Sequence, residues 1–213
     1  MALLLKLLTI FMLQVGVSLA GFIPQFDMKF KRVGEDVLLN CPVKESSDQC
    51  SNSTWSFNRP SDDRNMKRMI FEENTDQSSA GDSRLSLSRN CSLLIRNLTA
   101  EDGGVYGCHN EMAVLLGILS ITSSPPDVNG WVDLTCSLKG LQKPGQCGPR
   151  LIFWVDETGT PLSDKTPEFE VKQTNICDLV LSVKHQSGNN KRFTCQLIAY
   201  DEVKVEAVYV FTE

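Results

Sequence analysis

Apolar and polar residues alternate in short stretches along most of the chain, and this period of two is typical of β-strands that bury one face. Between residues 37 and 41 the alternation places Val37, Leu39 and Cys41 on one face. Trp55 and Phe57 follow the same rule in the next stretch. Further strands are expected over residues 21–33, 66–71, 84–88, 91–98 and 114–122. The pattern predicts an all-β chain.

The second half of the chain repeats this pattern. Its expected inward-facing residues are Val132, Leu134 and Cys136, then Ile152 and Trp154, then Phe193, Cys195, Leu197 and Ala199, and finally Val203, Val205, Ala207, Tyr209 and Phe211. Between the halves, Pro125 and Pro126 fix two φ angles and remove two N–H donors. We therefore expect two tandem β-sandwiches, at 21–122 and 127–213, joined by a short, stiff linker at 123–126.

Residues 1–20 are expected to be a signal peptide. An apolar run from Leu7 to Leu19 follows a lysine, and small residues precede the cleavage site expected before Gly21. The alternative is a membrane anchor, for which this run is short. No later apolar run reaches the roughly 18 residues that a membrane helix needs. We expect no membrane insertion of the mature chain, which is either secreted or the ectodomain of a longer protein.

Export also makes the eight cysteines interpretable, because an oxidising compartment lets thiols pair and persist. A zinc site would normally show Cys-x-x-Cys spacing, which the sequence lacks. Disulfides are therefore favoured. The net charge of −5, which becomes −6 when Lys6 leaves with the signal, argues against nucleic acid or an anionic membrane surface as partner.

Four residues of the first half carry a resemblance to a known family. Cys41, Trp55, Tyr106 and Cys108 have the spacing of an immunoglobulin variable-type domain, which the first half resembles. The resemblance implies that Cys41 pairs with Cys108 between the sheets and that Trp55 packs on the sulfur pair. It also implies that Tyr106 forms the tyrosine corner of this family.

The same resemblance implies an ion pair between Arg84 and Asp102 at one end of the first sandwich. In the second half, Cys136, Trp154 and Cys195 hold matching places, which implies a second bridge, Cys136–Cys195, with the tryptophan in the core. Only 58 residues separate these two cysteines, and a phenylalanine stands at the tyrosine-corner position. The second half is therefore expected to be a constant-like or intermediate immunoglobulin domain.

Each half keeps two further cysteines, in matching places. Cys50 and Cys147 each precede the core tryptophan of their half by a few residues, and Cys91 and Cys177 each lie 17 or 18 positions before its last cysteine. We therefore predict the pairs Cys50–Cys91 and Cys147–Cys177. These bridges would tie the loop between the second and third strands to the fifth strand of the family pattern. Their role is either to present a rigid loop to a ligand or stabilisation alone.

As a whole the chain resembles the two-domain immune-type immunoglobulin proteins of bony fish. The motifs that carry the resemblance are residues 34–41, 84–87, 90–95 and 102–108. The resemblance implies a secreted recognition protein of innate immunity that binds a protein or a microbial surface ligand. The alternative is the ectodomain of a membrane receptor or adhesion protein. The oligomeric state stays open.

Three Asn-x-Ser/Thr sequons, at Asn52, Asn90 and Asn97, are candidate glycosylation sites in an exported chain. The alternative at each is an unmodified surface asparagine. We rank Asn97 and Asn52 above Asn90, because Cys91 is the middle residue of that sequon and bridge formation competes with glycosylation there.

The two histidines, His109 and His185, have no serine or cysteine nucleophile in a recognisable setting. We expect no catalytic residue, no metal site and no cofactor. The expected contact surface is the loop at 109–113, in which His109, Asn110, Glu111 and Met112 combine polar groups with an adaptable methionine, beside the loop that Cys50 tethers. The alternative is an ordinary solvated turn.

Overall fold

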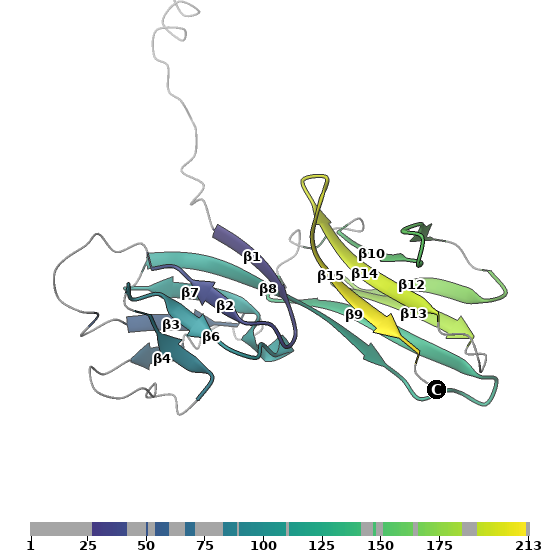
Figure 1. Ribbon diagram of the computed structural model, residues 1–213, viewed down its shortest axis with the longest axis horizontal. Helices are drawn as coiled ribbons and strands as arrows, with labels where there is room; N and C mark the ends of the chain where they lie inside the picture. Colours follow the sequence, from purple (N-terminus) through teal and green to yellow (C-terminus); the bar gives the residue numbers. More distant parts are fainter. Residues whose placement is uncertain are drawn as a thin grey trace, which may run out of the picture.

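The computed structural model describes residues 27–41, 50, 54–59, 67–70, 83–88, 90–109, 111–141, 147, 151–163, 166–184 and 191–211, with the backbone alone for 67–70 and 111–113. The expected signal peptide, Asn52, Asn110 and His185 lie outside these residues. The described part forms two β-sandwich units that lie end to end (Figure 1). Within it, no helix is long and apolar enough to cross a membrane.

The first unit packs two sheets face to face. Its strands are β1 (Asp27–Arg32), β2 (Val37–Leu39), β3 (Thr54–Asn58), β4 (Lys67–Ile70), β5 (Leu85–Leu87), β6 (Leu93–Ile95), β7 (Gly104–Cys108) and the first part of β8 (Glu111–Ser123). The 3-10 turn η1 (Ala100–Asp102) precedes β7. One sheet has the order β2-β6-β5, and β4, β3, β7, β8 and β1 form the other. The alternation in β2 is as expected, because Val37 and Leu39 are buried and Leu38 is exposed.

The second unit takes its strands from β8 onward. They are β9 (Trp131–Lys139), β10 (Ile152–Val155), β11 (Pro161–Leu162), β12 (Phe169–Asn175), β13 (Asp178–Lys184), β14 (Arg192–Ala199) and β15 (Glu202–Val210). One sheet has the order β12-β13-β9-β8 and the other β11-β10-β14-β15. Between them Trp154 is fully buried, with Leu134, Leu138, Leu181 and Leu197 around it in one cluster.

The strand β8 belongs to both units. Along one edge it pairs first with β7, from Glu111 to Leu116, and then with β9, from Ile118 to Ser123. Along residues 114–119 it also pairs in parallel with β1. One sheet therefore continues from the first unit into the second, and in Figure 1 β8 passes between the two lobes without a break.

Both faces of β8 are apolar because each faces a different core. Leu116 and Ile118 belong to the buried cluster of the first unit, whereas Leu115 and Leu119 belong to that of the second. Side chains alternate between the two faces of a strand, so neighbouring residues enter opposite cores. A strand covered on both faces needs an uninterrupted apolar run rather than alternation, and residues 114–119 supply it.

The pairing of β8 shows that the linker predicted at 123–126 is wrong. Ser123 still pairs with Leu134, and the Ser124 N–H donates to the Asp133 carbonyl at 2.9 Å, so these residues lie inside the second unit. The two prolines occupy the turn between β8 and β9. A turn tolerates missing N–H donors as well as a linker does, which is why the Pro-Pro pair did not distinguish the two.

One inward-facing prediction in the second unit is also wrong. Ala207 and Phe211 are buried, but Val203 is 50% exposed. The register between β14 and β15 shifts between Leu197 and Ile198, which leaves one extra residue in β15. A bulge of this kind moves the residues beyond it to the other face of the sheet.

The four disulfides join Cys41 to Cys108, Cys50 to Cys91, Cys136 to Cys195 and Cys147 to Cys177, the four pairs expected from the sequence. The two tryptophans also have matching hydrogen bonds. The Trp55 indole N–H donates to the Cys91 carbonyl at 3.0 Å, and that of Trp154 donates to the Leu179 carbonyl at 3.1 Å. The bridges Cys50–Cys91 and Cys147–Cys177 close the shorter loop of each unit and are called the smaller bridges below. Trp55 thus bonds to the second cysteine of its smaller bridge, and Trp154 bonds to the residue two positions after the second cysteine of its own.

Because all eight cysteines are paired, we expect no titratable thiol in the folded protein. The measurement is thiol titration of denatured protein without reductant, with reduced protein as the positive control. Two titratable thiols per chain would contradict the four-bridge arrangement.

Candidate contact surface

The first unit has one end against the second unit and one end that points away. The strand β7 begins at Gly104, whose N lies within 2.9 Å of a Cβ built on Gly140 of the second unit. It ends at Cys108, which is therefore at the far end, called the distal end below. There the His109 N–H donates to the Thr54 carbonyl at 2.9 Å, so the end of β7 meets the start of β3.

The distal turn between β7 and β8 is shorter than the loop expected at 109–113. Cys108 pairs directly with Glu111, and Gly107 pairs with Met112, so only two residues remain outside the ladder. His109 is exposed and adopts a φ of 50°, the positive φ that two-residue hairpin turns require. The side chains of Glu111 and Met112 and the whole of Asn110 lie outside the described residues.

A second distal feature is the turn between β5 and β6, to which Cys50 is bonded. The Ser88 N–H donates to the Ser92 carbonyl at 2.9 Å, and the Cys91 N–H donates to the Ser88 carbonyl at 3.0 Å. Cys91 carries both the bridge to Cys50 and the carbonyl that accepts from Trp55. The chain at residue 50 is thereby fixed to the core of the unit, close to the strand ends that hold His109.

His109 also lies beside the main disulfide. Its ring nitrogen and the sulfurs of Cys41 and Cys108 all lie within 4.8 Å of one another. Both sulfurs are used in the disulfide, and it is the thiolate that binds a metal. This group of three is therefore part of the turn's packing and not a metal site.

Three of the predicted structural residues, Arg84, Asp102 and Tyr106, meet at the opposite end, next to the second unit. Asp102 accepts from Arg84 at 2.7 and 3.1 Å, as the resemblance implied. The Tyr106 hydroxyl donates to the Asp102 carbonyl at 2.7 Å, which closes the tyrosine corner. The sequence did not indicate Thr99, whose N–H and hydroxyl both donate to the Asp102 carboxylate, at 2.7 and 3.0 Å.

The second unit covers part of the outer face of the first unit's larger sheet. Phe30 and Val105 pack against the hydrophobic cluster of the second unit, in which Leu115 is buried. The strand β15 contacts both β1 and β8 at this place. The outer face near the junction is therefore closed to a ligand, whereas His109 at the distal end is exposed.

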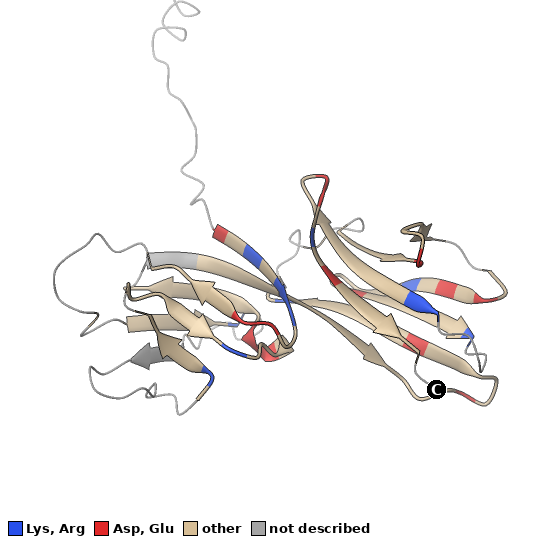
Figure 2. Ribbon diagram, in the orientation of Figure 1, with Lys and Arg blue, Asp and Glu red and all other residues tan. Residues whose placement is uncertain are grey.

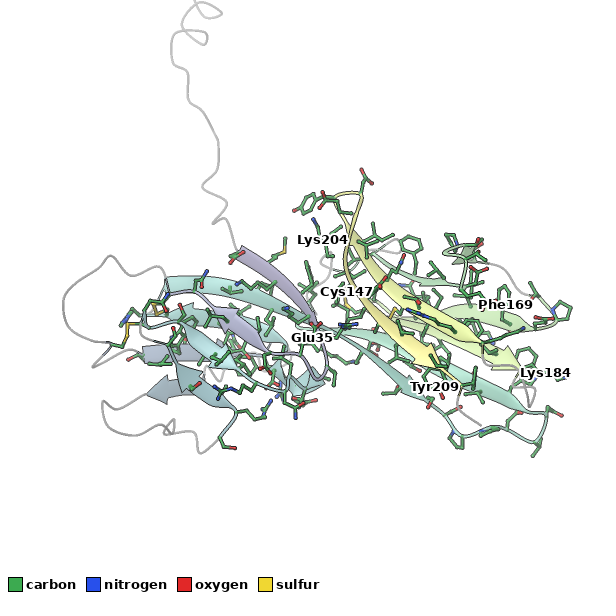
Figure 3. All side chains as sticks on the ribbon, in the orientation of Figure 1. Glu35, Cys147, Phe169, Lys184, Lys204 and Tyr209 are labelled. Carbon is green, nitrogen blue, oxygen red and sulfur yellow. A yellow bond between two sulfur atoms is a disulfide. The ribbon has the colours of Figure 1, made fainter. Side chains whose placement is uncertain are left out.

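Charged side chains pair with one another in the turn between β1 and β2, next to the junction. Figure 2 shows basic residues along β1, and Figure 3 shows Glu35 between the two units. Partial burial alone would raise the pKa of Glu35, but hydrogen bonds from Arg32 and the charge of Lys31 hold it below the usual value. A depressed pKa means that this contribution to stability is present at neutral pH and is lost as the pH falls through the folded-state pKa.

The sequons that the structure describes lie at opposite ends of β6. Asn90 is exposed in the distal turn before this strand. Asn97 is exposed at the junction end, where its N–H donates to Asp36 at 2.8 Å and its carbonyl accepts from Arg84 at 3.2 Å. A glycan on Asn97 would stand beside the junction, and one on Asn90 would stand beside the distal turns.

A second exposed surface lies on the outer face of β14 and β15. Val203, Val208 and Val210 are 50%, 37% and 46% exposed, and they pair with Ile198, Thr194 and Arg192 on the same face. This surface, called the valine face below, is the main alternative to the distal end for a protein contact.

The disulfide-bridged sandwich, with its tyrosine corner and buried tryptophan, defines the first unit as an immunoglobulin-type domain. Residues 30–117, which make up most of the described part of the first unit, match the model of the immunoglobulin V-set domain. Among curated protein sequences, none matches the chain. Among solved structures, the chain is similar to bovine butyrophilin, with a TM-score of 0.36 and 16% identity over 89% of this chain and 96% of that chain.

Proposed function

We propose that the protein is a non-catalytic recognition protein of innate immunity, secreted, that binds a protein or microbial surface ligand through the distal end of its V-set unit. The observation that carries the proposal is the distal end itself. There the two-residue turn at His109 and the chain at Cys50 are fixed to the same core, through Thr54 in one case and Cys91 in the other. Short turns on a rigid scaffold are the usual place for variable contacts in this fold.

The closed junction supports the same choice of surface. Since the outer face of the larger sheet is covered near Phe30 and Val105, a ligand can reach the first unit more readily at the distal end. The similarity of the whole chain to two-domain immune-type proteins of bony fish, which rests on sequence motifs, supplies the innate-immune part of the proposal. No cofactor is proposed.

The alternative function is that of the ectodomain of a membrane receptor or adhesion protein. The V-set match favours both functions equally. Sequencing the transcript beyond the codon for Glu213 distinguishes them, because a stop codon favours secretion and a connecting segment with an apolar run favours a receptor.

The binding prediction concerns a variant with His109→Ala, Glu111→Ala and Met112→Ala. We expect its affinity for a ligand captured by the disulfide-intact tandem to fall by about 1 kcal/mol or more, because contact residues at such a surface carry energies of this size. Thermal unfolding should stay nearly unchanged if all three side chains face solvent, as that of His109 does. The measurements are calorimetric titration and a melting curve.

The control for this prediction is Val208→Ser with Val210→Ser on the valine face. The distal-end assignment predicts that the control binds normally. Loss of binding in the control together with normal binding of the distal variant would move the contact to the second unit.

A further inference from the structure

The Ser92 hydroxyl is a buried polar group that the fold does not use. Its residue has 0% relative exposure, and the hydroxyl oxygen has no hydrogen-bond partner among the residues that the structure describes. A buried donor left unpaired is destabilising, so an alanine at this position would serve the core equally well or better. Such groups are rare in folded proteins and call for an explanation.

The explanation lies two residues earlier. Ser92 is the third residue of the sequon that begins at Asn90, and a sequon requires a hydroxyl at this position. Asn90 itself is exposed, and its side-chain oxygen accepts a hydrogen bond from the Ser88 hydroxyl, which leaves the amide nitrogen for attachment. The asparagine is accessible in the folded protein, whereas the hydroxyl is not.

In the folded protein the backbone of this tripeptide is not in an extended conformation. Cys91, its middle residue, has a φ of 61°, and the bridge to Cys50 holds it in the turn between β5 and β6. A non-glycine residue in this region is strained, and release of the bridge removes a covalent tether that keeps it there. With the Cys50–Cys91 bridge closed, the tripeptide is bent and its hydroxyl is buried.

We propose that Asn90 is a glycosylation site that is open only before the Cys50–Cys91 bridge forms, and that Ser92 is retained for the glycosyltransferase rather than for the fold. The co-reactant is an oligosaccharide linked to a lipid diphosphate. The Asn90 amide nitrogen forms a bond to the anomeric carbon of the sugar, the bond from that carbon to the diphosphate oxygen breaks, and the lipid diphosphate leaves with the electron pair. The amide nitrogen gives up one proton.

The Cys50–Cys91 bridge would thus control whether the distal end of the V-set unit carries a glycan. Chains that are glycosylated first still form the bridge, because the exposed Asn90 side chain leaves room for the sugar. Chains that form the bridge first keep a bare distal end. The protein would thus leave the cell in two forms that differ next to the proposed contact surface. The inference rests on the export that the proposed function includes.

The test expresses the full chain in secretory cells behind a leader of known activity, so that Asn90 is examined whether or not residues 1–20 act as a signal. Mass spectrometry of the peptide that contains Asn90 measures the occupied fraction, with Asn90→Gln as the assignment control. We expect partial occupancy in the unaltered chain and a rise of about twofold or more in Cys50→Ser, because the sequon stays open longer. The matched control, Cys147→Ser, opens the corresponding bridge of the second unit and should leave occupancy unchanged.

Ser92→Ala provides an independent readout, since it does not disturb the bridge. We expect no glycan at Asn90 and a melting temperature that is unchanged or raised. Both proteins are deglycosylated enzymatically before the comparison. A clearly lower melting temperature for Ser92→Ala than for the unaltered chain would then mean that the hydroxyl serves the fold. Equal occupancy of Asn90 in the unaltered chain and in Cys50→Ser, whether none or full, would equally overturn the proposal. Failure of export with the native leader alone would overturn the proposed secretion and leave these results standing.

Discussion

Gly140→Ala is expected to destabilise the protein by about 3–4 kcal/mol, at the upper end of single substitutions. Gly140 has a φ of +95°, and a Cβ there would lie 2.2 Å from the Leu116 carbonyl oxygen and 2.9 Å from the Gly104 nitrogen. All the close atoms are backbone, so no side-chain movement relieves the clash. This clash would lie just after the end of β9, beside the part of β8 that passes from one unit to the other. The measurement is chemical denaturation, in which a single transition should shift to lower denaturant concentration.

The chain offers a matched control at Gly159. Its φ of +82° is similar, but nothing lies within 4 Å of a Cβ built there. Gly159→Ala therefore has only the conformational cost of a positive φ, about 1–2 kcal/mol. Gly34, with a φ of +88° and nothing within 4 Å, is the equivalent control in the first unit. An equal loss of stability in all three variants would mean that the close approach at the junction contributes nothing.

Asp102→Ala is expected to cost about 2–4 kcal/mol, because it removes the acceptor of a partly buried guanidinium and of two Thr99 groups. The Asp102 and Arg84 side chains are only 13% and 28% exposed, so solvent screens this pair less than a surface pair. The carboxylate also holds the turn that contains the Asp102 carbonyl, and this carbonyl accepts a hydrogen bond from the Tyr106 hydroxyl. The measurement is the free energy of unfolding at neutral pH.

The control for this prediction is the neighbouring acidic residue. Glu101 pairs with Arg59 at 3.0 Å, but its side chain is 73% exposed. Glu101→Ala removes the same charge from the same turn and should cost about 1 kcal/mol or less, as exposed ion pairs do. A double-mutant cycle between Arg84 and Asp102 then separates the pair from the rest of the network. Equal losses for the Asp102 and Glu101 variants would contradict the assigned role of the buried pair.

The sequence indicated the strands and the cysteine pairs because both follow local rules. A half-buried strand requires a period of two, and the two halves repeat the same cysteine and tryptophan spacing. The strand at 114–122 was predicted, but its sharing between the two units was not, although the signal for it was present. The run from residue 114 to 119 does not alternate, which is typical of a strand buried on both faces, and the neighbouring Pro-Pro pair was interpreted as a linker instead.

The remaining errors come from register, which depends on contacts between distant segments. A one-residue shift between β14 and β15 turned Val203 outward, and the pairing of Cys108 with Glu111 shortened the distal loop. Neither shift is visible in a single strand's pattern, because every residue beyond a bulge exchanges faces without any change in composition. The burial of the Ser92 hydroxyl was not predictable either, because it depends on tertiary packing, whereas the sequon itself was recognisable from the sequence.

The strand β8 also sets the separation between the two units of the protein. Its 13 residues span roughly 40 Å at about 3.3 Å per residue, and backbone hydrogen bonds tie it to β7 at one end and to β9 at the other. A tandem on a loose tether samples many separations and loses that freedom when both of its ends are engaged. Here one continuous strand fixes the separation of the two units. If the protein bridges two surfaces, the gap between them is set in advance, and partners at other spacings are rejected by geometry alone.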